Sequence, residues 1–210
     1  MRAIIFDLDG VLVSTDHFHD DAWRALARRL KISFDETACR RLRGVSRMAA
    51  LELVLEQSPR RYTAAEKEAL AAEKNTAYRA HIAGMTPADV ADSTRTTLRS
   101  LKRRGLLLAV GSSSKNARFI LEQTALTSYF DAIVDGNEIT RSKPDPEVFL
   151  KAAAKLDVSP AEALVVEDAA AGIRAARSGG FQSAALGPDA AEEGLASHQI
   201  QNLADLLALV

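Results

Sequence analysis

Short apolar runs bounded by Gly, Ser, Asp or Lys recur along the chain, and segments with helical spacing of apolar residues lie between them. Such runs are typical of strands buried on both faces, and their alternation with helices is typical of a parallel α/β fold. The predicted strands are residues 3–6, 106–110, 132–134, 164–166 and 183–186. The predicted helices are residues 93–104, 115–125, 146–156, 170–178 and, at the end, 203–209. The pattern predicts a Rossmann-like parallel sheet core.

The first two predicted strands are separated by about 100 residues, far more than one crossover helix requires. Within that interval, four further helices are predicted at residues 17–31, 35–42, 46–57 and 64–83. We therefore expect an α-helical bundle, residues 16–87, inserted after strand one into an α/β catalytic core of residues 1–15 and 88–210. A cap domain over a site is the functional interpretation, and a decorative insertion is the alternative.

Composition limits the partners of the chain. Of its 210 residues 47% are hydrophobic, and 27 Lys and Arg against 28 Asp and Glu leave a net charge of −1. This balance predicts no nucleic acid and no membrane as a partner, and the basic pairs are expected on solvated faces. The opening apolar run is too short for an export signal, so we expect a cytoplasmic protein. The single cysteine, Cys39, cannot form an internal disulfide and is predicted to be a small buried side chain.

Acidic residues follow two of the predicted strands, where open α/β sheets bind their ligands. Asp7 and Asp9 are two residues apart, so they share one face while the backbone stays extended, and Gly10 then allows a turn. Asp168 comes in from another strand end. Hard oxygen ligands without His or Cys suit Mg²⁺. Any one of these aspartates alone is more simply a helix cap or a surface charge.

Two further strand ends carry groups that suit a phosphate. The run Gly111-Ser112-Ser113-Ser114-Lys115-Asn116 offers hydroxyls, backbone N–H groups at a helix start and a lysine. Lys143 precedes Pro144, which disfavours helical geometry and directs the lysine toward the sheet edge. A serine helix cap and a solvated lysine are the alternatives. A carboxylate nucleophile, Mg²⁺ and a cation together suit phosphoryl transfer through an aspartyl-phosphate, with the second aspartate as general acid and base.

The chain resembles the haloacid dehalogenase superfamily of phosphotransferases in the order and spacing of four motifs over essentially its whole length. The motifs are Asp7-Leu8-Asp9-Gly10-Val11, the run from Gly111 to Asn116, Ser142-Lys143-Pro144-Asp145-Pro146, and Glu167-Asp168. The predicted cap is similar to that of the β-phosphoglucomutase family. The residues that carry this second likeness are His19, Trp23, Leu42-Arg43-Gly44-Val45-Ser46-Arg47 and Glu73-Lys74-Asn75 with Tyr78.

The resemblance implies a role for each matching position. Asp7 would be the nucleophile, Asp9 the general acid and base, and Mg²⁺ would be held by Asp7, the Asp9 carbonyl, Glu167 and Asp168. Ser112 and Lys143 would hold the transferring phosphoryl group. The second phosphate and the sugar would contact residues of the serine run and the cap: His19, Arg43, Gly44, Val45, Ser46, Arg47, Lys74, Ser113, Ser114, Lys115 and Asn116. Trp23, four residues after His19, is either a further substrate contact or a packing partner of that histidine.

The implied reaction is the interconversion of β-D-glucose 1-phosphate and β-D-glucose 6-phosphate through β-glucose 1,6-bisphosphate, by a monomeric enzyme. The alternative is a magnesium-dependent sugar-phosphate phosphatase, in which water attacks the aspartyl-phosphate. A haloalkanoic dehalogenase is disfavoured because Asp9 and the metal carboxylates would have no task. Arg43 stands where many relatives carry lysine, and this substitution keeps the charge but changes its geometry.

Overall fold

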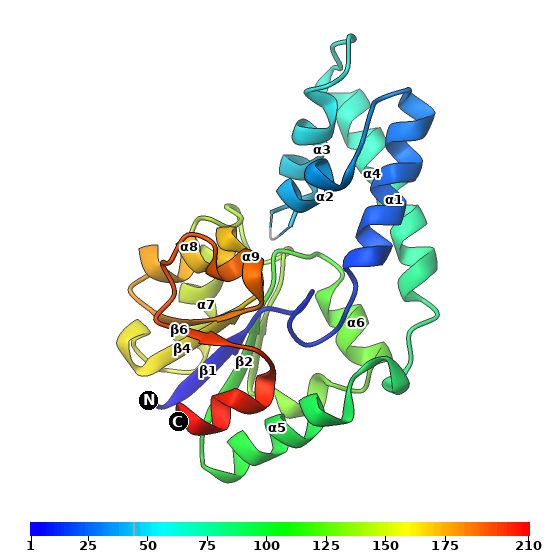
Figure 1. Cartoon of the computed structure of the whole chain (residues 1–210). Helices are drawn as coiled ribbons and strands as arrows, with labels where there is room; N and C mark the ends of the chain where they lie inside the picture. Colours follow the sequence, from blue (N-terminus) through cyan, green and yellow to red (C-terminus); the bar gives the residue numbers. More distant parts are fainter. Residues whose placement is uncertain (44) are drawn as a thin grey trace.

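A computed structural model describes residues 1–43 and 45–210 and contains one parallel sheet of six strands (Figure 1). The strands are β1 (Ala3–Phe6), β2 (Leu107–Gly111), β3 (Ala132–Val134), β4 (Ala163–Glu167), β5 (Gln182–Leu186) and β6 (His198–Ile200). Their order is β3-β2-β1-β4-β5-β6, so the winding direction reverses between β1 and β4. Ligand crevices of open α/β sheets lie at such a reversal. The predicted α/β class is confirmed.

The five predicted strands are confirmed to within one residue at each end, and a sixth was missed. β6 has three residues, His198, Gln199 and Ile200, of which only Ile200 is buried. Such a segment contains no apolar run and gives no periodic signal. The four-residue helix α9 (Pro188–Ala191) was missed for the same reason.

Helices cover both faces of the sheet because alternate strand residues point to opposite sides. Ile4 and Phe6 of β1 pack into one apolar cluster with α5 (Asp92–Arg103), α6 (Ala117–Gln123) and the 3₁₀ helix η4 (Leu203–Ala208). Ala3 and Ile5 pack into another cluster with α7 (Glu147–Lys155) and α8 (Ala170–Ser178). Shorter 3₁₀ helices connect these elements: η1 (Pro87–Asp89), η2 (Thr127–Tyr129) and η3 (Pro160–Glu162).

The helix predicted at residues 115–125 begins two residues later, at Ala117. Serine side chains in the preceding loop account for the shift, because they bond to the backbone in place of a helical turn. The Ser112 hydroxyl accepts from the Ser114 N–H at 3.1 Å, and the Ser114 hydroxyl accepts from the Asn116 N–H at 3.2 Å. We call residues 112–116 the serine loop.

The four helices between β1 and β2 lie together beyond the carboxyl ends of the strands (Figure 1). They are α1 (Asp16–Leu30), α2 (Glu36–Arg41), α3 (Arg47–Leu55) and α4 (Ala64–Ile82). Trp23 of α1, Leu51 of α3 and Leu70 of α4 belong to an apolar cluster separate from those of the sheet. Tyr78 and Ile82, in the last turns of α4, instead join the sheet's cluster. Cys39 is buried on α2, as predicted.

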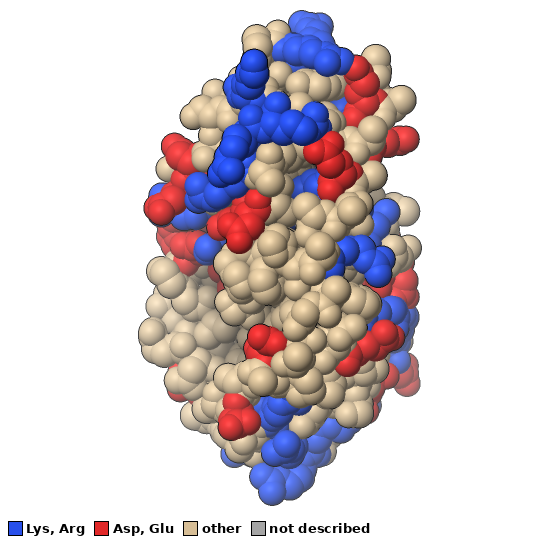
Figure 2. All heavy atoms as spheres, turned by 90° about the vertical axis from the view of Figure 1, so that its right-hand side faces the viewer, with Lys and Arg blue, Asp and Glu red and all other residues tan. Residues whose placement is uncertain are grey.

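Basic side chains gather at the two ends of the face shown in Figure 2, separated by a broad area with few charges. Several of the arginines on the helices between β1 and β2 pair with acidic neighbours, such as Arg29 with Glu73 at 2.6 Å and Arg41 with Glu56 at 2.9 Å. These exposed pairs are what a solvated face presents. Among the described residues, no helix is both long enough and apolar enough to cross a membrane.

Replacement of Phe149 should test the packing beneath the sheet. Phe149 is fully buried on α7 and packs edge to face against Phe181. We expect Phe149→Ala to lower the free energy of unfolding by about 3–5 kcal/mol, because the substitution leaves a cavity that the sheet cannot close. Urea denaturation measures the change. Leu150→Ala on the same helix is the matched control: Leu150 is 40% exposed, and its loss should change stability by about 0.5 kcal/mol or less. Equal losses in both variants would contradict this packing.

Candidate active site

Strand register brings the acidic motifs together. Phe6 of β1 pairs with Val166 of β4, and the Asp7 N–H donates to the Val166 carbonyl at 2.9 Å. The next residues on the two strands, Asp7 and Glu167, therefore lie side by side. On the other side of β1, Phe6 pairs with Val110, which brings the serine loop to the same edge.

Lys143 closes the space between the two strand ends. Its ammonium nitrogen lies 2.6 Å from Asp7 Oδ1 and 2.6 Å from Glu167 Oε1. Lys143 is 2% exposed and Glu167 is fully buried, so these are charged hydrogen bonds shielded from water. Burial alone would lower the pKa of Lys143, but the charges of Asp7 and Glu167 outweigh it and raise the pKa above its ordinary value. The ammonium is a fixed positive charge, not the solvated lysine of the alternative interpretation.

One lysine does not balance the acidic groups of this edge. Asp7, Glu167 and Asp168 can each place one oxygen within 4.8 Å of the others. Burial, followed by neighbouring carboxylates, raises the pKa of Asp168 and, despite Lys143, that of Glu167. Raised carboxyl pKa values mark a site short of positive charge. A hard divalent cation with oxygen ligands fits this donor set.

Gly10 makes the approach of Asp168 possible. Its φ is +78°, and a Cβ built at this position would lie 2.0 Å from Asp168 Oδ2. A side chain here would strain the backbone and push Asp168 out of the cluster. Gly10 therefore provides the predicted turn and also leaves the space that the Asp168 carboxylate occupies.

Asp9 lies at the junction of the sheet edge and the helices between β1 and β2. The hydroxyl of Thr15, which is fully buried, donates to Asp9 Oδ1, and His19 Nε2 lies 3.9 Å from the same oxygen. Burial, followed by the charge of Asp7, raises the pKa of Asp9 to about 7. A carboxyl group with such a pKa can both donate and accept a proton near neutrality.

Lys74 of α4 is the centre of a second polar group. It is 3% exposed, its Nζ lies 2.8 Å from His19 Nδ1, and it sits 4.8 Å and 4.7 Å from the ring centres of Trp23 and Tyr78. His19 stacks on Tyr78 with ring centres 4.0 Å apart. His19 and Trp23 thus meet at Lys74. Burial, followed by the charge of Arg47, lowers the pKa of Lys74 to about 7.

Two arginines from the helices between β1 and β2 line the cavity: Arg43, which lies between α2 and α3, and Arg47, the first residue of α3. Arg43 Nη1 lies 2.7 Å from Asp189 of α9, and its Nε lies 3.6 Å from Asp16 of α1. Arg47 is half-buried at the start of α3, and burial lowers its pKa. The Ser46 hydroxyl caps α3 by accepting from the Ala49 N–H at 3.3 Å. Asn75 of α4 makes another bridge, since its side-chain oxygen accepts from the Asn116 amide of the serine loop at 2.9 Å.

A cavity of about 460 Å³ connects these groups. All predicted site residues line it except Glu167, which is buried behind Lys143 and Asp7, and Gly44, which lies outside the described residues. Thr15 and Asp189, which contact Asp9 and Arg43, were not predicted. Nothing in their sequence neighbourhoods marks them, because both contacts depend on how the helices between β1 and β2 lie on the core.

Comparison with known proteins agrees with the motif order. A family model described as haloacid dehalogenase-like hydrolase matches residues 1–180. The chain belongs to this family. It is accordingly an enzyme of the haloacid dehalogenase superfamily, whose members generally use Mg²⁺, and its acidic cluster is compatible with that ion.

Relatives of this haloacid dehalogenase-like enzyme include both kinds of phosphotransferase that the sequence left open. A β-phosphoglucomutase of Bacillus subtilis is 42% identical over 89% of this chain and 84% of its own. A fructose-1-phosphate phosphatase of Escherichia coli is 30% identical over 86% of this chain and 93% of its own. A crystal structure of a β-phosphoglucomutase from Clostridium difficile superposes with a TM-score of 0.92 at 33% identity, covering 98% of this chain and 93% of that one. The resemblance to the β-phosphoglucomutases is confirmed.

Magnesium should stabilise the folded enzyme through the acidic cluster. At about 100 times its dissociation constant, a ligand of the native state adds about 2.7 kcal/mol, which is about 5–10 °C in melting temperature for a chain of this size. We expect Asp168→Asn to remove most of that shift. Differential scanning calorimetry with Mg²⁺ and with EDTA measures it. Asp157→Asn, at an exposed position of the core, should keep the full shift. An unchanged shift in Asp168→Asn would place the metal elsewhere.

Proposed function

We propose that the enzyme is a phosphomutase that interconverts β-D-glucose 1-phosphate and β-D-glucose 6-phosphate through β-glucose 1,6-bisphosphate. The observation that carries the proposal is that two cationic groups line one cavity: Lys143 beside Asp7, and Lys115 of the serine loop with Arg47. A phosphatase acting on a simple ester needs only the first. A sugar with two phosphates requires both.

In the proposed reaction, a carboxylate oxygen of Asp7 attacks phosphorus and forms an aspartyl-phosphate, while the bond from phosphorus to the sugar oxygen breaks. Asp9 gives its proton to that oxygen. In the second half-reaction Asp9 takes the proton of the other sugar hydroxyl, whose oxygen attacks the aspartyl-phosphate and regenerates Asp7. Lys143 remains charged throughout and stabilises the negative charge on the transferring group.

Asp7, Glu167, Asp168 and the backbone carbonyl of Asp9 are the groups we propose for Mg²⁺. When bound, the ion supplies charge stabilisation of the transferring phosphoryl group. Ser112 and Lys143 would hold that group, and Ser114, Lys115, Asn116 and Arg47 would hold the other phosphate. His19, Trp23, Arg43, Val45, Ser46, Lys74 and Ser113 would line the remaining sugar site.

We propose further that residues 16–87 act as a cap domain on a core of residues 1–15 and 88–210. The separate apolar cluster that contains Trp23, Leu51 and Leu70 supports this division. Two contacts connect the two parts: Arg43 pairs with Asp189, and Asn75 accepts from Asn116. Both join the helices between β1 and β2 to the core around the cavity. A closed cap would exclude water from the aspartyl-phosphate, which is the condition for transfer to a sugar hydroxyl in place of hydrolysis.

The second candidate is a sugar-phosphate phosphatase of the same family, favoured by the Escherichia coli relative that is 30% identical. Its chemistry would use the same Asp7, Asp9 and Lys143. The two functions differ only in the nucleophile of the second step, a sugar hydroxyl or water.

Phosphorus NMR separates the two functions. With β-glucose 1-phosphate, Mg²⁺ and a trace of β-glucose 1,6-bisphosphate, we expect glucose 6-phosphate to accumulate, and Asp7→Asn to abolish turnover because the nucleophile is lost. Asp157→Asn, the same substitution at an exposed position, is the matched control and should keep the wild-type rate. Inorganic phosphate as the main product would show a phosphatase. A near-normal rate in Asp7→Asn would contradict the aspartyl-phosphate.

The pH dependence of binding tests Lys74. Its pKa is lowered to about 7 in the free enzyme, and a phosphorylated sugar beside it should raise that pKa. Binding then takes up a proton above pH 7, so the affinity for glucose 6-phosphate should fall with rising pH by up to about tenfold per pH unit. Isothermal titration calorimetry between pH 6 and 9 measures it. Lys74→Met should lose this contribution and retain the titrations of the ligand and of Asp9, and a pH profile identical to wild type would exclude this role.

A further inference from the structure

The segment that follows β3 lies against the serine loop, and its Gly136 also lines the cavity. The Gly136 N–H donates to the Ser114 carbonyl at 3.1 Å, and the Asn137 side-chain amide donates to the Lys115 carbonyl at 3.1 Å. The Ser113 carbonyl faces the same segment, since a Cβ built on Gly136 would lie 2.3 Å from its oxygen. Three consecutive carbonyls of the serine loop thus face residues 136 and 137.

Close approach of the two segments depends on Gly136. Besides meeting the Ser113 carbonyl, its added Cβ would come within 2.9 Å of the Lys115 backbone nitrogen. Both neighbours are backbone atoms, which cannot rotate away as a side chain can. Any larger residue would displace the serine loop.

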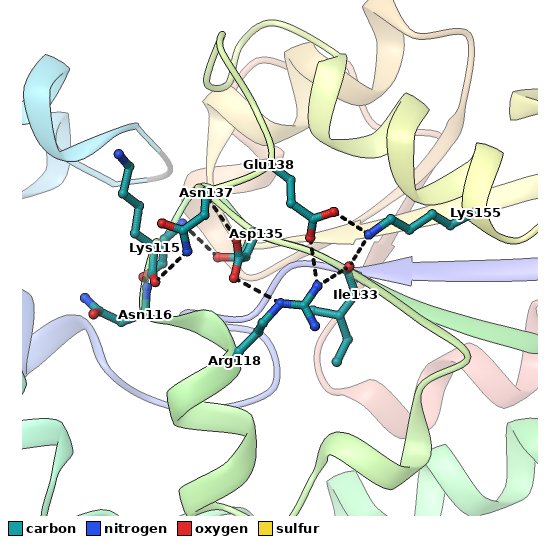
Figure 3. A network of polar contacts seen from close by, with 10 residues as sticks. Lys115, Asn116, Arg118, Ile133, Asp135, Asn137, Glu138 and Lys155 are labelled. Atoms are coloured by element: carbon teal, nitrogen blue, oxygen red, sulfur yellow. Dashed lines mark hydrogen bonds and ion pairs between the residues drawn. The ribbon is translucent and has the colours of Figure 1, made fainter.

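The segment is itself fixed from inside. Asp135 is 1% exposed, and one of its carboxylate oxygens accepts from the Asn137 N–H at 2.8 Å. Its other oxygen lies 3.4 Å from Nε of Arg118 on α6 (Figure 3). A buried carboxylate requires such partners, because an unpaired charge is costly away from water.

Arg118 and Lys155 extend this attachment. Arg118 donates to Glu138 at 2.8 Å and to the Ile133 carbonyl at 3.0 Å, while Lys155 of α7 donates to the same carbonyl at 2.9 Å and also bonds to Glu138. Because α6 begins directly after the serine loop, Arg118 completes a closed circuit from the loop through α6 to Asp135 and back to Ser114. In Figure 3 the side chains of Lys115 and Asn116 extend out of this network, on the side of the helices between β1 and β2.

We propose that residues 135–137 are positioning residues, which hold the backbone of the serine loop so that Ser114, Lys115 and Asn116 bind the second phosphate of a sugar bisphosphate. The proposal rests on the phosphomutase function proposed above. It separates the two phosphate sites: Ser112 is anchored by the sheet, where its N–H donates to the Val134 carbonyl at 3.1 Å, whereas residues 113–115 are shaped by the segment after β3. Damage to that segment should therefore affect the second phosphate more than the transferring one.

Two variants test the proposal with two substrates. Gly136→Ala should raise the KM for β-glucose 1,6-bisphosphate at least tenfold, and Asn137→Ala, which removes one exposed contact, about threefold. Both should change kcat/KM for a small aryl phosphate, which has a single phosphate, less than twofold. Gly84→Ala is the matched control, since a Cβ there would meet nothing closer than 3.6 Å and Gly84 does not have a positive φ. If Gly136→Ala fails to fold, the same comparison of the two substrates in Asn137→Ala tests the proposal.

Coupling to Lys115 distinguishes positioning from a general loss of structure. In a Lys115→Ala background, Asn137→Ala should have little further effect on the bisphosphate KM, because the residue it positions is gone. Equal loss for both substrates, full additivity with Lys115→Ala, or an unchanged bisphosphate KM in the folded variants would each overturn the proposal. Bisphosphate occupies both sites whether its product is a sugar phosphate or inorganic phosphate. Release of inorganic phosphate by the wild type would therefore contradict the mutase function while the KM comparison still tests residues 135–137.

Discussion

The ion pairs of Lys143 are the interaction on which the rest of the site depends. Parallel pairing of β1 with β4 forces Asp7 and Glu167 together in a place closed to water, where two carboxylates repel strongly. The ammonium 2.6 Å from each makes that arrangement tolerable. Removal of one partner from a buried pair typically costs about 3–5 kcal/mol, since the other charge remains uncompensated. Lys143, which we propose stabilises the transferring phosphoryl group, thus also allows the sheet edge to fold.

The strand order determines what else can reach this edge. The reversal between β1 and β4 opens a crevice, and the serine loop enters it from β2 because β2 lies next to β1. The segment after β3 then contacts the serine loop, since β3 lies next to β2. β2 thus contributes the serine hydroxyls, and the chain after β3 contributes both residues 136 and 137, which contact the backbone of the serine loop, and Lys143, which reaches Asp7.

The sequence predicted the parts of the molecule that depend on short-range residue patterns, and those that follow because parallel strands end at one edge of the sheet. Apolar runs located five strands, and the rule that parallel strands end at one edge was enough to gather Asp7, Ser112, Lys143 and Asp168. Contacts set by the path of a loop or by the seating of one set of helices on another could not be predicted. Thr15 reaches Asp9, and Arg43 reaches Asp189, through such paths. The Gly136 contact belongs with these, because a glycine required by a neighbouring backbone resembles any loop glycine in sequence.

The two walls of the cavity have opposite electrostatic needs. On the sheet side burial raises the pKa values of Asp9 and Asp168, so these carboxyls lack a cation. On the helical side burial lowers those of Lys74 and Arg47, so these bases lack an anion. The ring of His19 lies between Asp9 and Lys74, and burial lowers its pKa, so it remains neutral and leaves each wall to be neutralised by what enters the cavity. A divalent cation on one wall and a phosphorylated sugar on the other meet both needs at once. Binding of either should therefore favour binding of the other. The cation cancels the negative charge that repels the phosphates, and the phosphates cancel the positive charge that repels the cation.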